Sequence, residues 1–141
     1  MDVSTKGPLF ALLHAVGSVE SFVDSRLAAI GLSIPKLTAL SRLVEAGDSL
    51  PLGRLAERLA CVKSNVTQLV DRLEADGLVA RTPDPGDRRS CLAVITEAGR
   101  KACEEGVRVQ HEAERRVFGV LSDEEAIRLA EIVEKLERAR A

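Results

Sequence analysis

The chain has 141 residues, 45% of them hydrophobic, which fits one domain with a substantial core and leaves no room for two independent ones. Its formal net charge of -2 shows no overall basicity of the kind that marks many nucleic-acid binders. With three phenylalanines and no tyrosine or tryptophan, the composition argues against an aromatic stacking platform for single-stranded nucleic acid.

Helical patterns fill the first half of the chain. Apolar residues recur at three- and four-residue steps over Leu9–Ile30, which predicts a long helix with Gly31 as its C-terminal cap. A second helix is expected over about Pro35–Gly47. Shorter patterns follow at Pro51–Ala60 and Val62–Gly77. Because two helices this close in sequence must turn sharply against each other, we predict a helix-turn-helix unit.

A β-hairpin is expected after the second short helix. Leu78–Thr82 and Ser90–Thr96 have the length and composition of short strands. Pro83–Arg89 then becomes the loop between them.

Two further helices close the chain. Thr96 is a good cap for a long helix, and Ser122 with Glu125 forms a capping box for the last one. The apolar stripes of these helices, Ala102–Val120 and Ile127–Leu136, are too long to be covered by one small domain. We therefore expect them to form an interface between two copies of the chain.

Basic residues are slightly concentrated in the middle of the chain. From Arg54 to Lys101 there are nine basic and seven acidic residues, so this segment carries +2 and the two flanks together carry -4. A charge asymmetry of this kind, although weak here, accompanies polyanion binding.

The second short helix carries the predicted DNA-reading residues. In a helix-turn-helix the second helix lies in the major groove, with its N-terminal turns against base edges. With the apolar residues inward, the outward face is polar and free of acid over its first two turns, although an ordinary solvated helix face is the alternative. Amide, hydroxyl and basic side chains can reach bases or phosphates. The predicted reading residues are Lys63, Ser64, Asn65, Thr67, Gln68 and Arg72, and the one acid on the same face is Asp71.

The hairpin loop has two adjacent arginines at its tip. Arg88 and Arg89 suit a minor groove beside the recognition helix, where groove width and negative potential are read. Asp87 is close enough in sequence to hold one guanidinium in a fixed orientation. The alternative is a solvated surface turn, which Asp, Gly and Pro commonly build.

The segment from Leu50 to Lys101 closely resembles the winged helix-turn-helix core of the MarR (multiple antibiotic resistance regulator) family. The features that carry the resemblance are LAERL in the first short helix, VTQLVDRLEADGLV in the second helix and the strand after it, DRR at the hairpin tip and TEAG at the next helix start. The flanking helices agree with the family in order and length.

This resemblance implies a homodimeric transcriptional regulator, interpreted as a ligand-responsive repressor, that binds a palindromic operator in double-stranded DNA. The first helix and the last two would interlock between protomers. In the family's D-x-R pattern Arg89 would enter the minor groove and Asp87 would orient it. Two positions depart from the family: Ala60 stands where glycine is frequent, and Val62 stands where a serine cap is frequent. We therefore expect a weaker helix cap, at a cost of about 1 kcal/mol.

Cysteines and histidines indicate no metal site and no cofactor. Cys61 and Cys91 fall in apolar patterns and are interpreted as small hydrophobic residues, whereas a redox role for Cys103 stays open. His14 and His111 are far apart and form no ligand motif. The resemblance also implies a small aromatic or phenolic effector, bound in a cleft walled by the first, second and fifth helices.

We therefore predict an α+β, mainly α protein, a winged helix-turn-helix with flanking dimerisation helices. Residues 1–34 would form the N-terminal dimerisation helix, 35–98 the DNA-binding domain and 99–141 the C-terminal dimerisation helices. Without a signal peptide or membrane span, and with an odd number of cysteines, the chain is expected to be cytoplasmic and to bind no membrane.

Two other functions compete with DNA binding. An enzyme has little support, because the sequence shows no nucleophile–base pair and no glycine loop for phosphate. A winged domain used as a protein-interaction module is the other rival. The salt dependence of duplex binding separates that module from a DNA binder.

Overall fold

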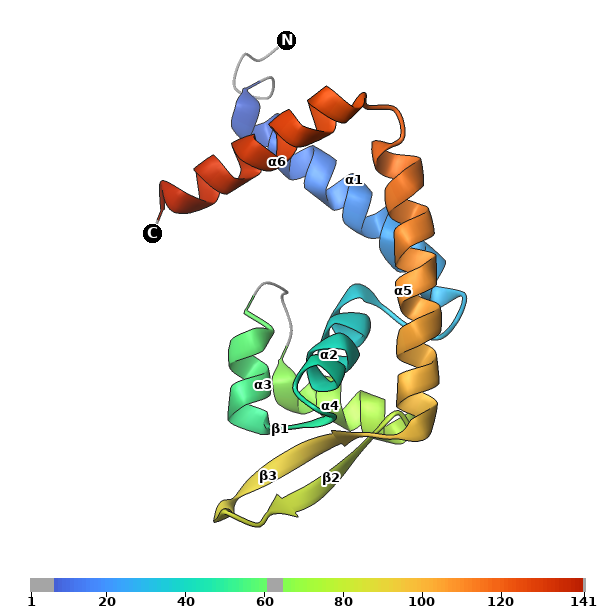
Figure 1. The fold of residues 1–141 in the computed structure, drawn as a ribbon, viewed down its shortest axis with the longest axis vertical. Helices are drawn as coiled ribbons and strands as arrows, with labels where there is room; N and C mark the ends of the chain where they lie inside the picture. The colour runs from blue at the N-terminus through green and yellow to red at the C-terminus, as the bar shows by residue number, and fades with distance from the viewer. Residues whose placement is uncertain (1–6, 61–64, 141) are drawn as a thin grey trace.

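The computed structural model describes residues 7–60 and 65–140 and shows a winged helix domain with three longer flanking helices (Figure 1). The predicted α+β, mainly α winged helix-turn-helix class is confirmed. The elements in chain order are α1 (Pro8–Ala28), α2 (Ile34–Glu45), β1 (Ser49–Pro51), α3 (Leu52–Arg58), α4 (Val66–Ala75), β2 (Val79–Asp84), β3 (Asp87–Ile95), α5 (Glu97–Phe118) and α6 (Asp123–Arg138).

A small antiparallel sheet forms the wing. Its strand order is β1-β3-β2, with Leu50 opposite Ala93 and Val79 opposite Ile95. The sequence does not predict β1, because three residues are too few for an alternating pattern and they pair only once β3 lies beside them. The β2–β3 ribbon projects from the end of the domain opposite to α1 and α6 (Figure 1).

The hairpin is tighter than predicted. Strand β2 runs to Asp84 and β3 starts at Asp87, so most of the residues expected in the loop Pro83–Arg89 belong to strands. The ladder pairs Pro83 with Cys91 and Asp84 with Asp87, and Arg88 and Arg89 lie in the irregularity between these two pairs. Only Pro85 and Gly86 lie between the strands, and Asp84 Oδ1 accepts a hydrogen bond from Gly86 N at 2.9 Å. This local side-chain bond lets a short turn reverse the chain. The expected long loop is therefore wrong.

Helix α2 lies at the centre of the core. It contacts α1, α3, α4, α5 and two strands of the sheet. Burial of its apolar side chains removes them from water on several sides at once, which is the main favourable term in folding. The largest fully buried side chains of the core are Leu27, Leu40, Leu43, Leu55, Val70, Leu73 and Val79.

Helix α5 is covered along part of its length by its own chain. Gly106 and Ala113 are buried, because α1 and α2 pack against this part of the helix. Phe118 and Val120, near the other end, are 42% and 83% exposed. The expectation that the apolar stripe Ala102–Val120 needs a second copy to cover it is therefore wrong over its first part.

Two helices carry apolar faces that the described chain leaves open. No residue of α6 is buried, and the N-terminal half of α1 is exposed as well. No helix among residues 7–60 and 65–140 has the length and apolar character needed to cross a bilayer. The exposed large apolar residues of these two helices are Leu9, Phe10, Leu12, Leu13, Val16, Ile127, Leu129, Ile132, Val133 and Leu136.

Gly99 lies where the first turn of α5 passes the backbone of Leu78. A Cβ at this position would collide with the Leu78 carbonyl oxygen and lie 2.7 Å from Ile95 Cγ1. We expect Gly99→Ala to lower the free energy of unfolding by about 1–3 kcal/mol, because a backbone carbonyl cannot move aside as a flexible side chain can. Urea unfolding at one fixed protein concentration measures the change.

Gly53→Ala is the matched control. A Cβ on Gly53 in α3 meets no atom within 4 Å, so we expect no loss of stability there. Equal unfolding midpoints for the two variants would show that the contact between α5 and Leu78 is not tight.

Candidate nucleic-acid interface

The recognition helix α4 begins later than predicted. Val66 is its first residue and Asn65 is its N-cap, with Asn65 Oδ1 accepting a hydrogen bond from Gln68 N at 3.2 Å. The expected start at Val62 with a weak cap is therefore wrong, because asparagine is among the strongest N-cap residues.

The predicted reading residues that the structure describes share one exposed side of α4. Leu69, Val70 and Leu73 are buried, which turns the opposite side of the helix outward. The exposed predicted residues are Asn65, Thr67, Gln68 and Arg72. Those that lie outside the described residues are Lys63 and Ser64, together with the neighbouring Cys61 and Val62.

A polar cleft of about 310 Å³ runs between α4 and the start of α2. It places the cationic side chains of Lys36 and Arg72 beside the amide groups of Asn65 and Gln68. Lys36 Nζ also lies 2.9 Å from Oδ2 of Asp76, the C-cap of α4, which ties the two helices together. This side of the domain therefore offers hydrogen-bonding groups and the cationic side chain of Arg72 to an anionic partner, while Lys36 shares its charge with Asp76.

Arg81 of β2 binds the acidic side of α4. Its guanidinium donates to Asp71 Oδ1 at 2.6 Å, to Glu74 Oε1 at 2.9 Å and to the Thr67 carbonyl oxygen at 3.4 Å. Its backbone N donates to Glu74 Oε2 at 3.1 Å. The hydrogen bond to Asp71 is the main reason that the pKa of Arg81 is raised, against partial desolvation and with help from the charges of both carboxylates.

Nothing in the sequence pattern singles out Arg81. Asp71 and Glu74 share one side of a helix, which is a local signal, but their partner lies beyond the turn that ends the helix. The one acid on the predicted reading face is therefore already paired within the chain.

The tip of the wing exposes Arg88 and Arg89. Asp87 Oδ1 accepts a hydrogen bond from the backbone N of Arg89 at 2.9 Å. The sequence predicts that Asp87 orients a guanidinium; in the structure its carboxylate instead holds the main chain of Arg89. Any orientation of Arg89 by Asp87 thus acts through the backbone.

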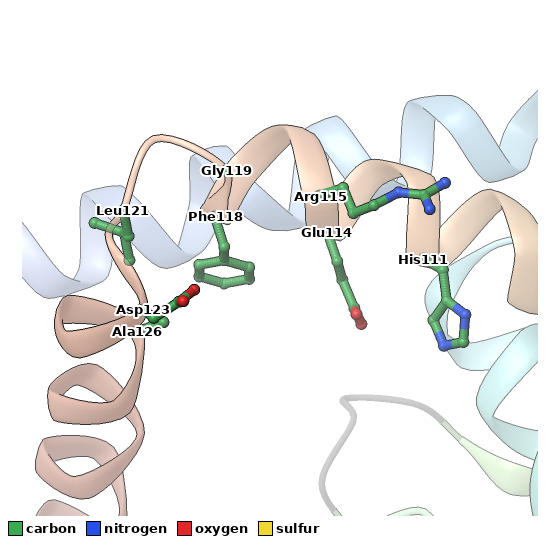
Figure 2. Close-up of a pocket in the computed structure, with 8 residues that line it drawn as sticks. All are labelled: His111, Glu114, Arg115, Phe118, Gly119, Leu121, Asp123 and Ala126. Atoms are coloured by element: carbon green, nitrogen blue, oxygen red, sulfur yellow. The ribbon is translucent and has the colours of Figure 1, made fainter.

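The bend between α5 and α6 surrounds an open hollow of about 770 Å³ (Figure 2). His111, Glu114 and Phe118 point from α5 toward the same side, and Asp123 lies near Phe118 at the start of α6 (Figure 2). Within the described residues, no group of three or more His, Cys, Asp or Glu side chains is arranged to hold a metal ion.

A second crevice, of about 490 Å³, lies between α2 and α5 and is lined by Val44, Asp48, Arg100, Cys103, Glu104 and Val107. Cys103 is 7% exposed, and its Sγ lies 3.6 Å from Ser41 Oγ. Cys91 is half-buried in β3, as a small hydrophobic residue can be. The crevice lies between two of the three helices expected to wall an effector cleft, α2 and α5, and none of its lining residues comes from α1.

The helix pair α3–α4, the hairpin beside it and the exposed side of α4 define a winged helix-turn-helix protein. The model of the MarR family matches residues 32–91. The HTH-type transcriptional repressor MdtR of Bacillus subtilis is 34% identical over 109 residues, which cover 77% of this chain and 70% of MdtR. The chain belongs to the MarR family; it is a transcriptional regulator and not an enzyme.

Solved structures of other proteins share this fold, including the two described next. A MarR mutant from E. coli complexed with operator DNA has a TM-score of 0.83 at 22% identity, covering 96% of this chain and 99% of that one. BpsR of Bordetella bronchiseptica, whose DNA binding is regulated by 6-hydroxynicotinic acid, has a TM-score of 0.83 at 23% identity, covering 94% of each chain. At these identities the likeness concerns the fold alone.

The cap of α4 can be tested by its effect on stability. We expect Asn65→Ala to lower the free energy of unfolding by about 0.5–2 kcal/mol, because Gln68 N loses its side-chain acceptor. Asn65→Asp keeps an oxygen in the same place and should preserve stability, since aspartate caps as well as asparagine. Thermal unfolding of both variants measures this, and a stable Asn65→Ala would mean that the cap does not set the start of the helix.

Proposed function

We propose that this chain is a repressor that binds a palindromic operator in double-stranded DNA as a homodimer, and that a small aromatic or phenolic molecule regulates it. Residues 35–98 bind DNA in this proposal, and residues 1–34 and 99–141 hold the dimer together. The observation that carries it is the exposed polar side of α4 beside a projecting hairpin with arginines at its tip (Figure 1). The repressor name of MdtR and the operator complex of the MarR mutant support it.

In the proposed complex α4 lies in the major groove and the wing in the adjacent minor groove. Asn65 uses its side-chain oxygen as the helix cap, so only its amide N–H remains for a base or phosphate. Gln68 can offer both donor and acceptor and is the better candidate for a bidentate contact with adenine. The other proposed contacts are Lys63, Ser64, Thr67 and Arg72 in the major groove, and Asp87, Arg88 and Arg89 in the wing.

The dimer in this proposal is supported by the open apolar faces of α1 and α6. Soluble monomers rarely expose contiguous apolar patches of this extent, whereas a second copy would cover both. A two-fold axis then places the same winged domain on each half of the operator. The two half-sites would lie about 10 bp apart, or a multiple of that spacing.

The proposed effector would act at a site where it contacts both the winged domain and a flanking helix. The crevice between α2 and α5 borders the winged domain on one side and a flanking helix on the other. An apolar wall with a few charged groups at the rim suits a small aromatic molecule with one polar substituent. The regulation of BpsR by 6-hydroxynicotinic acid supports an effector of this chemical class.

The dimer is tested by placing a charge on the open face of α6. Val133 is 47% exposed, and we expect Val133→Lys to shift the sedimentation of the chain from dimer toward monomer at micromolar concentration, because the interface would have to bury an unpaired charge. Glu131→Gln changes the net charge by the same amount on an exposed residue of the same helix and should leave the dimer intact. A monomeric parent chain in the same experiment would contradict the dimer.

DNA binding is tested by selecting bound sequences with the parent chain and with variants. We expect Gln68→Ala to cost about 1–3 kcal/mol in operator affinity and to relax the base preference at one position of each half-site. Arg89→Ala should weaken binding and flatten an A·T preference outside the centre of the palindrome, since the minor groove is read by its width.

Arg88→Ala is the control for charge alone. As a phosphate contact it should lower affinity for all sequences and reduce the slope of log affinity against log salt by about one per protomer. Sequence preferences that none of these variants alters would rule out α4 and the wing as the reading elements. A parent chain whose duplex affinity does not fall with salt would favour the protein-interaction module.

A further inference from the structure

Two carboxylates of α4 lie close to the proposed reading residues, and one of them, Asp71, is on the predicted reading face itself. Asp71 and Glu74 are both exposed on this helix. In a complex with duplex DNA their negative charges would stand near a dense row of phosphates, where like charges repel. A recognition helix with two unpaired acids would therefore bind its operator less well than its other residues allow.

Arg81 meets both acids from one position on β2. Thr67, Asp71 and Glu74 follow one another at helical spacing, and the guanidinium bridges all three with contacts of 3.4, 2.6 and 2.9 Å. Its side chain is only 24% exposed, whereas those of Asp71 and Glu74 are 59% and 43% exposed. The cation therefore lies beneath the two carboxylates, on the side of the hairpin.

We propose that Arg81 is a positioning residue for operator binding, which holds the carboxylates of Asp71 and Glu74 against β2 and offsets their charge. The reading face of α4 then presents neutral and basic groups to DNA although its sequence contains acids. This inference rests on the proposed function, because it takes α4 as the element that enters the major groove.

The same contacts also have a plain structural role, since they join the recognition helix to the wing. A structural role and the proposed electrostatic role differ in their salt dependence. Repulsion between exposed acids and phosphates is screened as salt rises, with a Debye length of about 10 Å at 0.1 M and about 3 Å at 1 M. A loss of stability or of helix orientation persists at every salt concentration.

An alternative interpretation of the site is that Asp71 itself contacts a base of the operator. A carboxylate can accept a hydrogen bond from cytosine N4, but it would have to leave Arg81 to do so. The geometry favours the paired state, because Asp71 and Arg81 are joined by a short charge-assisted hydrogen bond. The two interpretations predict opposite effects of Asp71→Asn on operator affinity.

The experiment measures operator affinity of the full-length chain across a salt series, with unfolding midpoints recorded for each variant. We expect Arg81→Gln to weaken binding about tenfold at low salt, and the loss to shrink toward high salt as screening removes the repulsion. Adding Asp71→Asn and Glu74→Gln to Arg81→Gln should restore most of the lost affinity, because no acid is left to offset. In the parent background Asp71→Asn should bind as well or a few-fold better, with an unchanged base preference.

Arg42→Gln is the matched control. Arg42 pairs with Glu45 within α2 at 3.2 Å, so its loss removes an ion pair without exposing an acid on α4. We expect its effect on operator affinity to be small and independent of salt. It also shows how much affinity a lost ion pair costs through stability alone.

Three outcomes would overturn the inference. A loss in Arg81→Gln that is the same at all salt concentrations and is not restored by removing the acids would make the residue structural. Weaker binding and an altered base preference in Asp71→Asn would make Asp71 a reader, and this variant decides the point even where Arg81→Gln does not fold. An Arg81→Gln variant that binds the operator like the parent chain would show that Arg81 has no role in operator binding.

The failure of the proposed function is distinguishable from these outcomes. If Gln68→Ala and Arg89→Ala leave operator binding unchanged, α4 and the wing are not the reading elements, and the proposed function fails. If those two variants behave as expected while the Arg81 series does not, only the present inference fails.

Discussion

Burial of helix α2 on several sides at once is the constraint on which the rest of the structure depends. Leu37, Leu40 and Leu43 belong to the core cluster, and the helix contacts the flanking helices α1 and α5 as well as α3, α4 and the sheet. Moving any of these elements away from α2 would open a void, and deleting one buried leucine costs about 2–5 kcal/mol for the same reason. The direction in which α4 presents its outward side is thus set by its inward contacts.

Features fixed by residues close in sequence could be predicted. Ser122 and Glu125 form the expected capping box, and Thr96 caps α5 by accepting from Gly99 N. The helical period also placed Leu69 and Leu73 inward and Gln68 outward, as the structure has them. Each of these features needs only contacts within about one helical turn or a regular period, so the sequence alone carries the information.

Features fixed by partners that are distant in the chain could not be predicted in the same way. The three residues of β1 form a strand only because β3 offers a ladder, and Arg81 finds its acids only after the chain has turned from α4 into β2. The predicted start of α4 was wrong for another reason. Val62 stands four residues before Val66 and extends the apolar period past the point where Asn65 caps the helix. The apolar period therefore extends in the N-terminal direction beyond the residue at which the hydrogen bonding of the helix begins.

Asp48 precedes β1, at the opposite edge of the sheet from β2, and joins elements there as Arg81 joins β2 to α4. Its φ of 87° lies in the left-handed region; its backbone N donates to Leu43 O at 2.7 Å and its carbonyl oxygen accepts from Ile95 N at 2.9 Å. Its carboxylate pairs with Arg100 of α5. The end of α2, strand β3 and the first turns of α5 therefore meet at one residue. Because β3 is hydrogen-bonded along β2, one sheet connects this junction to the contacts that Arg81 makes with α4. In the proposed dimer this connection would link the packing of α5 to the distance between the two recognition helices.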